Sequence, residues 1–373
     1  MTWRLDTDVQ QMLRESAQAF LADTGGPQHF RAVRAGDAGF DPATWAQMGE
    51  LGWTGILLPE AVGGAELGLA PALTLAEELG RAISPEPFVA ASVIAATVLA
   101  SASGEAAGAL AQDLASGRRS VALAWQEETG ALGAGGFETT LAEGRLSGRK
   151  VHVPAWHAAS ALLVAAQAAD GPVVVLVDPA AEGVAVSPTR MTDATQSAEI
   201  RFDGVRVADA SVILSGEAAR SAIDFALARG TVALCAQLEG LANALWRRTA
   251  DYVQQRVQFD QPLADFQALR HRMVDLYAAI ELAGASWRAA ARSLEDGGGA
   301  NRLAVHAAKA RCSDTALEMS RWAIQYHGAF GYTDEADVGL FVHAALRWAS
   351  WLGNATAHRR AALALHERGE GIG

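Results

Sequence analysis

The chain has 373 residues, half of them hydrophobic, and its 30 lysines and arginines face 42 aspartates and glutamates, which gives a formal net charge of −12. This length allows a large core and predicts two or three packed units rather than one small domain. The acidic balance argues against nucleic acid as a partner, although a local basic pocket can still accept an anionic substrate.

The N-terminus and the two cysteines indicate a cytoplasmic protein. Residues 1–9 contain acids where a signal peptide needs an apolar core, and the longest apolar runs, near 161–166 and 173–177, are too short to span a bilayer. Cys235 and Cys312 both lie in helix-like contexts, so we expect buried free thiols and no disulfide. We therefore predict a cytoplasmic location without membrane insertion.

Residues 8 to about 118 have the apolar spacing of helices. Thr7 is the predicted N-cap of the first helix, and Gln10 can complete a capping box with it. A further helix is expected to end at Gly52, and the next amphipathic helix at Gly80. This part of the chain is therefore predicted to be mostly helical.

Between Ser120 and about Leu214 the apolar period changes to that of strands. Residues 137–148 predict a strand, a turn and a second strand. The run 173–177 predicts a buried strand, and residues 198–205 alternate again. The sequence thus predicts a β domain between two helical blocks.

From Gly216 onward the helical spacing returns, and glycines at 297–299 separate two helices, with Asn301 as the predicted N-cap of the second. The order predicts an α+β protein with three domains, at residues 1–118, 119–214 and 215–373. The expected helices of the last domain cover residues 216–256, 262–295, 301–330 and 338–367.

Three motifs resemble those of one enzyme family. They are residues 52–64 with the later 77–80, residues 256–267 around Arg256-Val-Gln258-Phe259, and residues 325–335 with the later 351–354. In order and spacing along nearly the whole chain they are similar to the signatures of the acyl-CoA dehydrogenases.

This resemblance implies an N-terminal helical domain, a middle β-barrel or sandwich and a C-terminal four-helix bundle. It also implies an FAD-dependent oxidoreductase that dehydrogenates an acyl-CoA thioester. In the family, FAD accepts a hydride from the β-carbon while a carboxylate removes the α-proton. Electron-transfer flavoprotein is the expected electron acceptor, and no metal site is expected.

The residues at both family positions for the carboxylate base are not acids. The C-terminal position holds Leu352. The other, counted back from Arg256, falls at Gly230, and a register set on Arg229 gives Ala228 instead. We therefore expect no catalytic residue in this chain.

The residues expected beside the flavin ring also depart from the family. Trp125-Gln126-Glu127-Glu128 stands where the family has a threonine–glutamate–proline motif, and His152 and Pro154 replace a tryptophan and a threonine. Proline lacks both a hydroxyl and a backbone N–H, which a flavin oxygen or nitrogen would otherwise use.

By contrast, the residues that a family member contributes to the adenosine diphosphate end of a neighbour's FAD are retained. An arginine offers a bidentate fork to a diphosphate, and glycine permits close backbone approach. The resemblance assigns this cofactor-binding role to Arg256, Gln258, Phe259, Gln267, Gln325 and Gly328.

This one-sided loss resembles the subunit without a catalytic glutamate in heterotetrameric (α2β2) acyl-CoA dehydrogenases, including those of steroid side-chain degradation. In this interpretation a glutamate-bearing paralogue is the partner, and FAD is shared with it. Two alternatives stay open: a flavin monooxygenase of the same fold, or a homo-oligomeric scaffold or acyl-CoA binder without chemistry.

Overall fold

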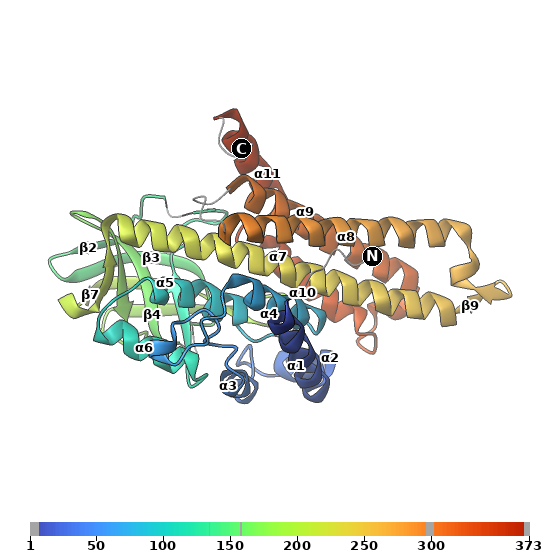
Figure 1. Ribbon diagram of the computed structural model, residues 1–373, viewed down its shortest axis with the longest axis horizontal. Helices are drawn as coiled ribbons and strands as arrows, with labels where there is room; N and C mark the ends of the chain where they lie inside the picture. Colours follow the sequence, from blue (N-terminus) through green and yellow to red (C-terminus); the bar gives the residue numbers. More distant parts are fainter. Residues whose placement is uncertain (1–6, 134, 157–158, 296–301, 369–373) are drawn as a thin grey trace. The chain divides into compact units, whose positions relative to one another are not determined.

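The elements follow the order helices, strands, helices along the chain (Figure 1). This order confirms the predicted α+β class. The residues predicted to separate and cap two helices, 297–299 and Asn301, lie outside the described residues. The computed structural model describes four stretches of the chain: residues 7–133, 135–156, 159–295 and 302–368.

Internal contacts group the chain into two compact units, each assembled from distant segments. One comprises residues 1–32, 73–84 and 231–373, and the other residues 33–72 and 85–230. The three consecutive domains with boundaries near 118 and 214 stay a prediction.

The N-terminal third is helical, as predicted. Thr7 accepts a hydrogen bond from the Gln10 amide, and the Gln10 side chain reaches back to Thr7 N at 3.1 Å, so the capping box is confirmed. Its helices are α1 (Asp8–Thr24), α2 (Pro27–Ala35), α3 (Pro42–Glu50), α4 (Leu69–Arg81), a buried π-helical turn η2 (Val89–Ala95), α5 (Ala96–Ala100) and α6 (Glu105–Ala115).

The middle of the chain forms one eight-stranded mixed sheet in the order β6-β7-β3-β2-β4-β5-β8, with β1 paired to β4 in parallel. Its core contains residues such as Leu146, Val164 and Ile200, which are fully buried. The strands are β1 (Ser120–Ala124), β2 (Thr140–Ala142), β3 (Arg145–Pro154), β4 (Ala159–Ala168), β5 (Gly171–Val177), β6 (Val184–Arg190), β7 (Gln196–Arg206) and β8 (Val212–Ser215).

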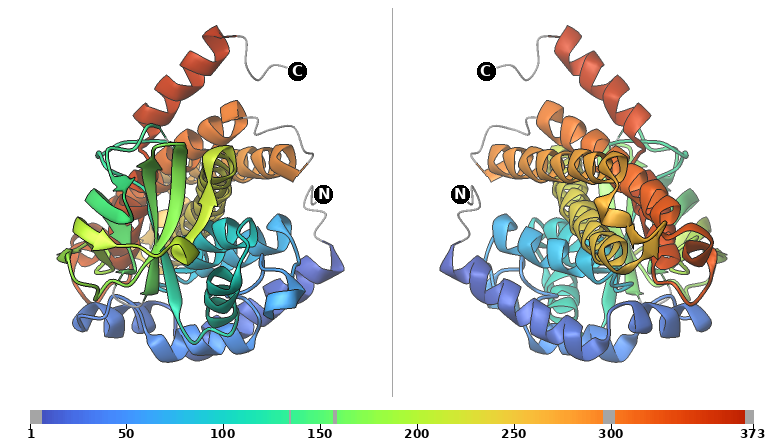
Figure 2. Two further views of the ribbon diagram at one scale, coloured as in Figure 1. Left: turned by 90° about the vertical axis from the view of Figure 1, so that its left-hand side faces the viewer. Right: turned by 90° about the vertical axis from the view of Figure 1, so that its right-hand side faces the viewer.

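Long helices return after the sheet. They are α7 (Gly216–Gln255), α8 (Gln267–Glu295), α9 (Arg302–His327), α10 (Val338–Ser350) and α11 (Ala355–Glu367). In Figure 1 α7, α8 and α9 run along one another, and Figure 2 looks down their length. Among the described residues, no helix combines the length and the apolarity needed to cross a bilayer.

Two of the expected helices differ from the observed ones. The segment 262–295 becomes helical at Gln267 because a hairpin precedes it. The segment 338–367 is two helices, since Leu352 and Gly353 take positive φ angles of 55° and 97°. Asn354 then caps α11 by accepting a hydrogen bond from the Ala357 amide.

The backbones of α4 and α7 touch where two glycines cross. A Cβ on Gly80 would lie 2.1 Å from Gln237 O, and one on Gly240 would lie 2.0 Å from Glu77 O. Only glycine fits at either position. The contact buries Glu77, which accepts hydrogen bonds from three arginines: Arg14 (3.3 Å), Arg81 and Arg288 (3.1 Å).

Candidate functional site

The six residues predicted to bind a cofactor come from segments that meet at one end of the helical bundle, marked by β9 in Figure 1. Tyr252, in the last turn of α7, stacks on His327 with the ring centroids 4.1 Å apart. The hydroxyl of Tyr326 donates to Leu269 O at 2.9 Å, which ties α9 to the start of α8. The end of α7, the start of α8 and the end of α9 therefore lie together.

A two-residue hairpin joins α7 to α8 at this end. Its strands are β9 (Val257–Gln258) and β10 (Gln261–Pro262), and the turn residues Phe259 and Asp260 both have positive φ, 53° and 63°. Such a turn suits asparagine and glycine, whereas a phenylalanine in this conformation is strained. The Phe259 side chain is 86% exposed. The hairpin thus holds a large apolar side chain out from the protein.

The other predicted residues frame this hairpin. Arg256 follows directly on α7, and its carbonyl accepts from Leu263 N at 2.9 Å. Gln267 opens α8 and Gln325 is exposed near the end of α9. Gly328 has a φ of +60°, and open space surrounds the place where a Cβ would stand. These features fit an extended, partly anionic ligand that approaches from outside.

A buried lysine, Lys309, donates hydrogen bonds to the loop that carries Leu352. The ammonium of Lys309 donates to three carbonyls, those of Trp348 (3.3 Å), Ala349 (3.0 Å) and Gly353 (3.0 Å). It thereby caps the C-terminal end of α10. Burial lowers the pKa of Lys309 to about 8.

A pair of histidines fixes the same loop. His358 Nε2 lies 2.8 Å from Leu352 O and must donate to it, so His358 Nδ1 is the acceptor from His306 Nδ1 at 2.8 Å. Burial lowers the pKa of His358 to about 3, with the bond to Leu352 opposing and the charge of Lys309 adding to the effect. His358 is therefore neutral at physiological pH, and the loop keeps its shape without a carboxylate.

The second position predicted for a base, Gly230, has no room for a side chain. A Cβ on Gly230 would stand 2.3 Å from Cγ1 of Ile94, a residue of the buried π-helical turn η2. An acidic side chain at this register would collide with Ile94. The adjacent register, Ala228, has no acid either.

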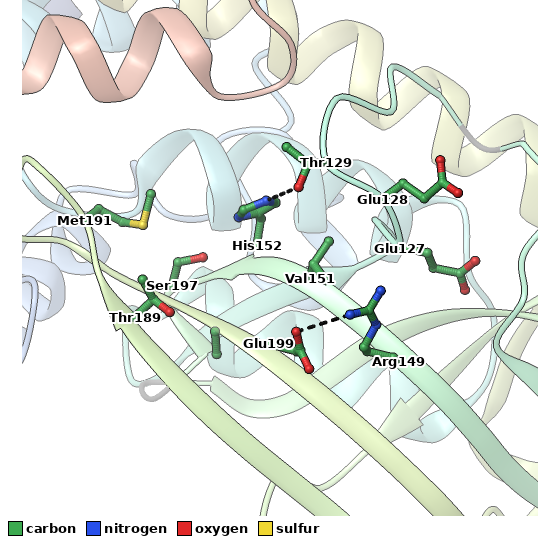
Figure 3. A pocket seen from close by; sticks show the side chains of 11 residues that line it. Glu127, Glu128, Thr129, Arg149, Val151, His152, Thr189, Met191, Ser197 and Glu199 are labelled. Carbon is green, nitrogen blue, oxygen red and sulfur yellow. Dashed lines mark hydrogen bonds and ion pairs between the residues drawn. The ribbon is translucent and has the colours of Figure 1, made fainter.

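A pocket of about 490 Å³ opens on the sheet near His152 (Figure 3). His152 has a φ of 55° at a bulge in β3, and its Nε2 lies 3.1 Å from the hydroxyl oxygen of Thr129. Bulges re-aim side chains, which explains how this histidine reaches the pocket. The pocket is lined by Glu127, Glu128, Thr129, Arg149, Val151, His152, Thr189, Met191, Ser197, Ala198 and Glu199.

One wall of the pocket depends on a buried ion pair. Lys150 is fully buried and donates to Glu127 at 2.6 Å and to Trp125 O at 3.3 Å. Burial lowers the pKa of Lys150 to about 8. Burial opposes the charge on Glu127, but hydrogen bonds from Lys150 and from backbone amides outweigh it and lower the pKa of Glu127. The Glu127 carboxylate also accepts hydrogen bonds from the backbone amides of Glu138 and Thr139. It therefore fixes the backbone at the end of the glycine-rich loop that precedes β2.

These residues do not fit a flavin ring. An isoalloxazine offers acceptor atoms and gains negative charge when it is reduced. Here three carboxylates, Glu127, Glu128 and Glu199, line the pocket, and the guanidinium of Arg149 already pairs with Glu199 at 3.5 Å. Pro154, on the same strand as His152, offers no N–H. No catalytic step is therefore derived through a flavin in this pocket.

Sequence reasoning missed both buried lysines. Lys150 follows Arg149 in a strand and has no apolar pattern around it, whereas Lys309 stands between Ala308 and Ala310 on an apolar helix face. For Lys309, a lysine inside an apolar pattern is the signal that was available. Within the described ranges, no group of three or more histidine, cysteine or acidic side chains is placed to hold a metal ion.

Family models and relatives show which family the sequence matches. The acyl-CoA dehydrogenase N-terminal and C-terminal domain models match residues 7–118 and 219–364. Acyl-CoA dehydrogenase FadE28 of Mycobacterium tuberculosis is 34% identical over 245 residues, which cover 64% of this chain and 69% of FadE28.

Two further similarities extend along nearly the whole chain. Acyl-CoA dehydrogenase IpdE2 of M. tuberculosis is 29% identical over 90% of both chains. The solved structure of a Tcur3481–Tcur3483 steroid ACAD variant superposes with a TM-score of 0.88 at 29% identity, covering 96% of this chain and 98% of that one. The predicted fold, with its N-terminal helical domain, central sheet and C-terminal bundle, is thereby confirmed.

Replacing Lys309 with methionine tests the cost of the buried ammonium. The folded pKa of about 8 lies below the ordinary value of 10.5, so between these values the unfolded chain binds more protons and stability rises with pH. The cost is fully present below pH 8 and absent above 10.5. We expect the wild type to gain about 1.4 kcal/mol per pH unit relative to Lys309→Met across this window, measured by urea unfolding.

The matched control is Arg292→Met on the exposed surface of α8, whose stability should follow the wild-type pH curve. Parallel curves for the wild type and Lys309→Met would contradict the assigned cost. Hydrogen exchange of residues 352–357 should also quicken in Lys309→Met, because Gly353 O loses its donor.

Proposed function

Because the chain belongs to the acyl-CoA dehydrogenase family of FAD-dependent oxidoreductases, we propose that it is the subunit without a base in a heteromeric acyl-CoA dehydrogenase. In this role it completes the FAD site of a glutamate-bearing paralogue, in an α2β2 assembly. The observation that carries the proposal is Phe259, 86% exposed on a strained turn. Such strain persists where a docking surface needs it.

In the proposed complex this chain binds the adenosine diphosphate end of the partner's FAD. Arg256 offers its guanidinium fork to the diphosphate, and Gln258, Gln267 and Gln325 offer amides to ribose and phosphate oxygens. Phe259 covers an aromatic or apolar surface of the ligand, and Gly328 lets the backbone approach closely. FAD supplies the hydride acceptor for the β-carbon of the acyl-CoA.

Proton removal belongs to the partner in this proposal. Leu352 has no group that accepts a proton, and Ile94 leaves no room for a side chain at Gly230. The acidic pocket beside His152 disfavours a second flavin in this chain. We therefore infer one FAD and one reacting acyl-CoA for each pair of unlike subunits.

The proposed substrate is a bulky acyl-CoA, such as a steroid side-chain thioester. Support comes from the likeness to the steroid ACAD at 29% identity along nearly the whole chain. Electron-transfer flavoprotein is the proposed electron acceptor, and the cytoplasm the proposed location.

Co-expression with a glutamate-bearing acyl-CoA dehydrogenase encoded beside this chain tests the proposal. We expect this chain to be colourless when purified alone and to co-purify as a yellow complex, with one FAD per pair of unlike chains by absorbance. A yellow protein from this chain alone would favour a monooxygenase, and a colourless protein under both conditions would favour a scaffold or acyl-CoA binder.

Within that complex, Arg256→Ala should lower FAD retention, because one charge-assisted contact to the diphosphate is lost. A contact of this kind contributes about 1.5–3 kcal/mol, so we expect FAD to bind about tenfold more weakly or worse. Equilibrium dialysis of the complex against FAD measures it. Arg220→Ala, in the first turns of α7 and paired to Glu217 at 3.8 Å, is the control that should retain FAD. Unchanged flavin content in Arg256→Ala would count against the assigned role.

Leu352→Glu should not create an active homomer. The loop would present a carboxylate, but the pocket beside His152 would still be acidic. Pro154 would still offer no backbone N–H to a flavin ring. We expect no dehydrogenation of butyryl-, octanoyl- or steroid-side-chain-CoA by the purified variant, measured with an artificial electron acceptor. Leu352→Gln controls for the polar substitution. Turnover of any acyl-CoA by Leu352→Glu alone would overturn the interpretation of the sheet pocket.

A further inference from the structure

A stacked arginine lies beside the predicted cofactor residues at the bundle end. The guanidinium carbon of Arg272, on α8, stands 4.7 Å from the ring centroid of Trp322, on α9. One turn closer to the start of α8 and to the end of α9, the hydroxyl of Tyr326 donates to Leu269 O at 2.9 Å. Both contacts belong to the same α8–α9 seam, because Arg272 and Leu269 are three residues apart and Trp322 and Tyr326 four.

Trp322 also neighbours Gln325 on the surface of α9. Residues three apart on a helix have their Cβ atoms about 5–6 Å apart on one face. Gln325 is exposed, and Trp322 is partly exposed. Gln325 and Trp322 on α9 and Arg272 on α8 therefore form a continuous row of side chains. The row leads from the predicted cofactor residue Gln325 to the guanidinium of Arg272.

Charge balance calls for such a cation. The diphosphate of a dinucleotide carries about two negative charges at neutral pH, and Arg256 can balance one of them. The chain as a whole has a net charge of −12, so it provides no general attraction for an anion. The basic residues on the last turns of α9 and the first turns of α8 are Arg270, His271, Arg272 and Arg321, beside the acids Asp275 and Glu318.

Among these, Arg272 is positioned by Trp322 and is still able to bind an anion. Stacking on indole fixes the guanidinium plane, which reduces the conformational entropy lost when it binds an anion. Its ion pair with Asp275 is long, 3.8 Å, and both side chains are open to solvent, 41% and 67% exposed. An exposed pair of this kind contributes little, so a phosphate can replace Asp275.

We propose that Arg272, presented by Trp322, is a second cation for the adenosine diphosphate end of the FAD that this chain shares with its partner. The assignment rests on the proposed function and deepens it. Arg272 is a binding residue for the diphosphate or the adjoining ribose, and Trp322 is its positioning residue. Together with Arg256 it balances the ligand's charge from two separate helices.

The test measures FAD affinity of the purified heteromer by equilibrium dialysis for the wild type, Arg272→Ala, Arg272→Lys and Arg256→Ala. We expect Arg272→Ala to raise the FAD dissociation constant about tenfold. Arg272→Lys should recover part of the loss, since it keeps the charge and loses the stacked plane. Arg292→Ala, at the far end of the same helix, is the matched control and should bind like the wild type.

Two further readouts separate binding from folding. FAD should quench tryptophan emission of the wild-type complex more than that of Trp322→Phe. The FAD dissociation constant should also depend less on salt in Arg272→Ala. Thermal melts of each variant complex confirm that it is folded before FAD is added.

The outcomes distinguish the two levels of inference. Weakening by Arg256→Ala with a dissociation constant for Arg272→Ala within twofold of the wild type overturns the role of Arg272 and leaves the proposed function standing. Failure of the complex to bind FAD, or no effect of Arg256→Ala, overturns the proposed function and this assignment with it. Weakening by both variants supports both.

Discussion

The backbone contact between α4 and α7 is the constraint on which the helical part of this protein depends. Gly80 and Gly240 let the two helices approach until carbonyl oxygens occupy the space of a side chain. This closeness buries Glu77, and a buried carboxylate without partners would be costly, so three arginines from α1, α4 and α8 converge on it. The crossing thus brings α1, α4 and α8 together at Glu77.

Fixing α7 has functional consequences, since this single helix carries two different family positions. Gly230 marks one predicted position for the base, and Arg256, predicted to bind a neighbour's FAD, follows the end of the helix. About seven helical turns separate them. Ile94 can therefore fill the first position without disturbing the second. The two predicted features, a missing base at Gly230 and a cofactor-binding Arg256, are therefore structurally independent.

Local signals in the sequence predicted much of the fold. Thr7 and Gln10 predicted a capping box that is present, and the apolar runs predicted β5 and β7, because caps and periodicity act between residues close in sequence. The hairpin at Phe259 was missed because no glycine or asparagine marks its turn. The break at Leu352 was missed because it depends on Lys309 and His358, which approach it through tertiary packing.

In the candidate site, too, local signals were predictable and tertiary contacts were not. Motif spacing named Arg256, Gln325 and Gly328, and the structure brings their segments to one end of the bundle. Their role in binding FAD stays a prediction. The carboxylates around His152 were not predictable as a group, because Glu127, Arg149 and Glu199 come from a loop and two strands that only the sheet register brings together.

The charges of the sheet pocket and of the bundle end bear on the proposed division of the flavin site. Around the sheet pocket the carboxylates of Glu127, Glu128 and Glu199 outnumber the two cations that pair with them, Arg149 and Lys150. The excess negative charge repels a reduced flavin. At the bundle end, Arg256, Arg270 and Arg272 are interspersed along the chain with Asp260, Asp265 and Asp275. Meanwhile the Leu352 loop keeps a buried lysine and two histidines that cost desolvation energy. In the proposed subunit role, this support keeps the shape of the loop although Leu352 carries no base.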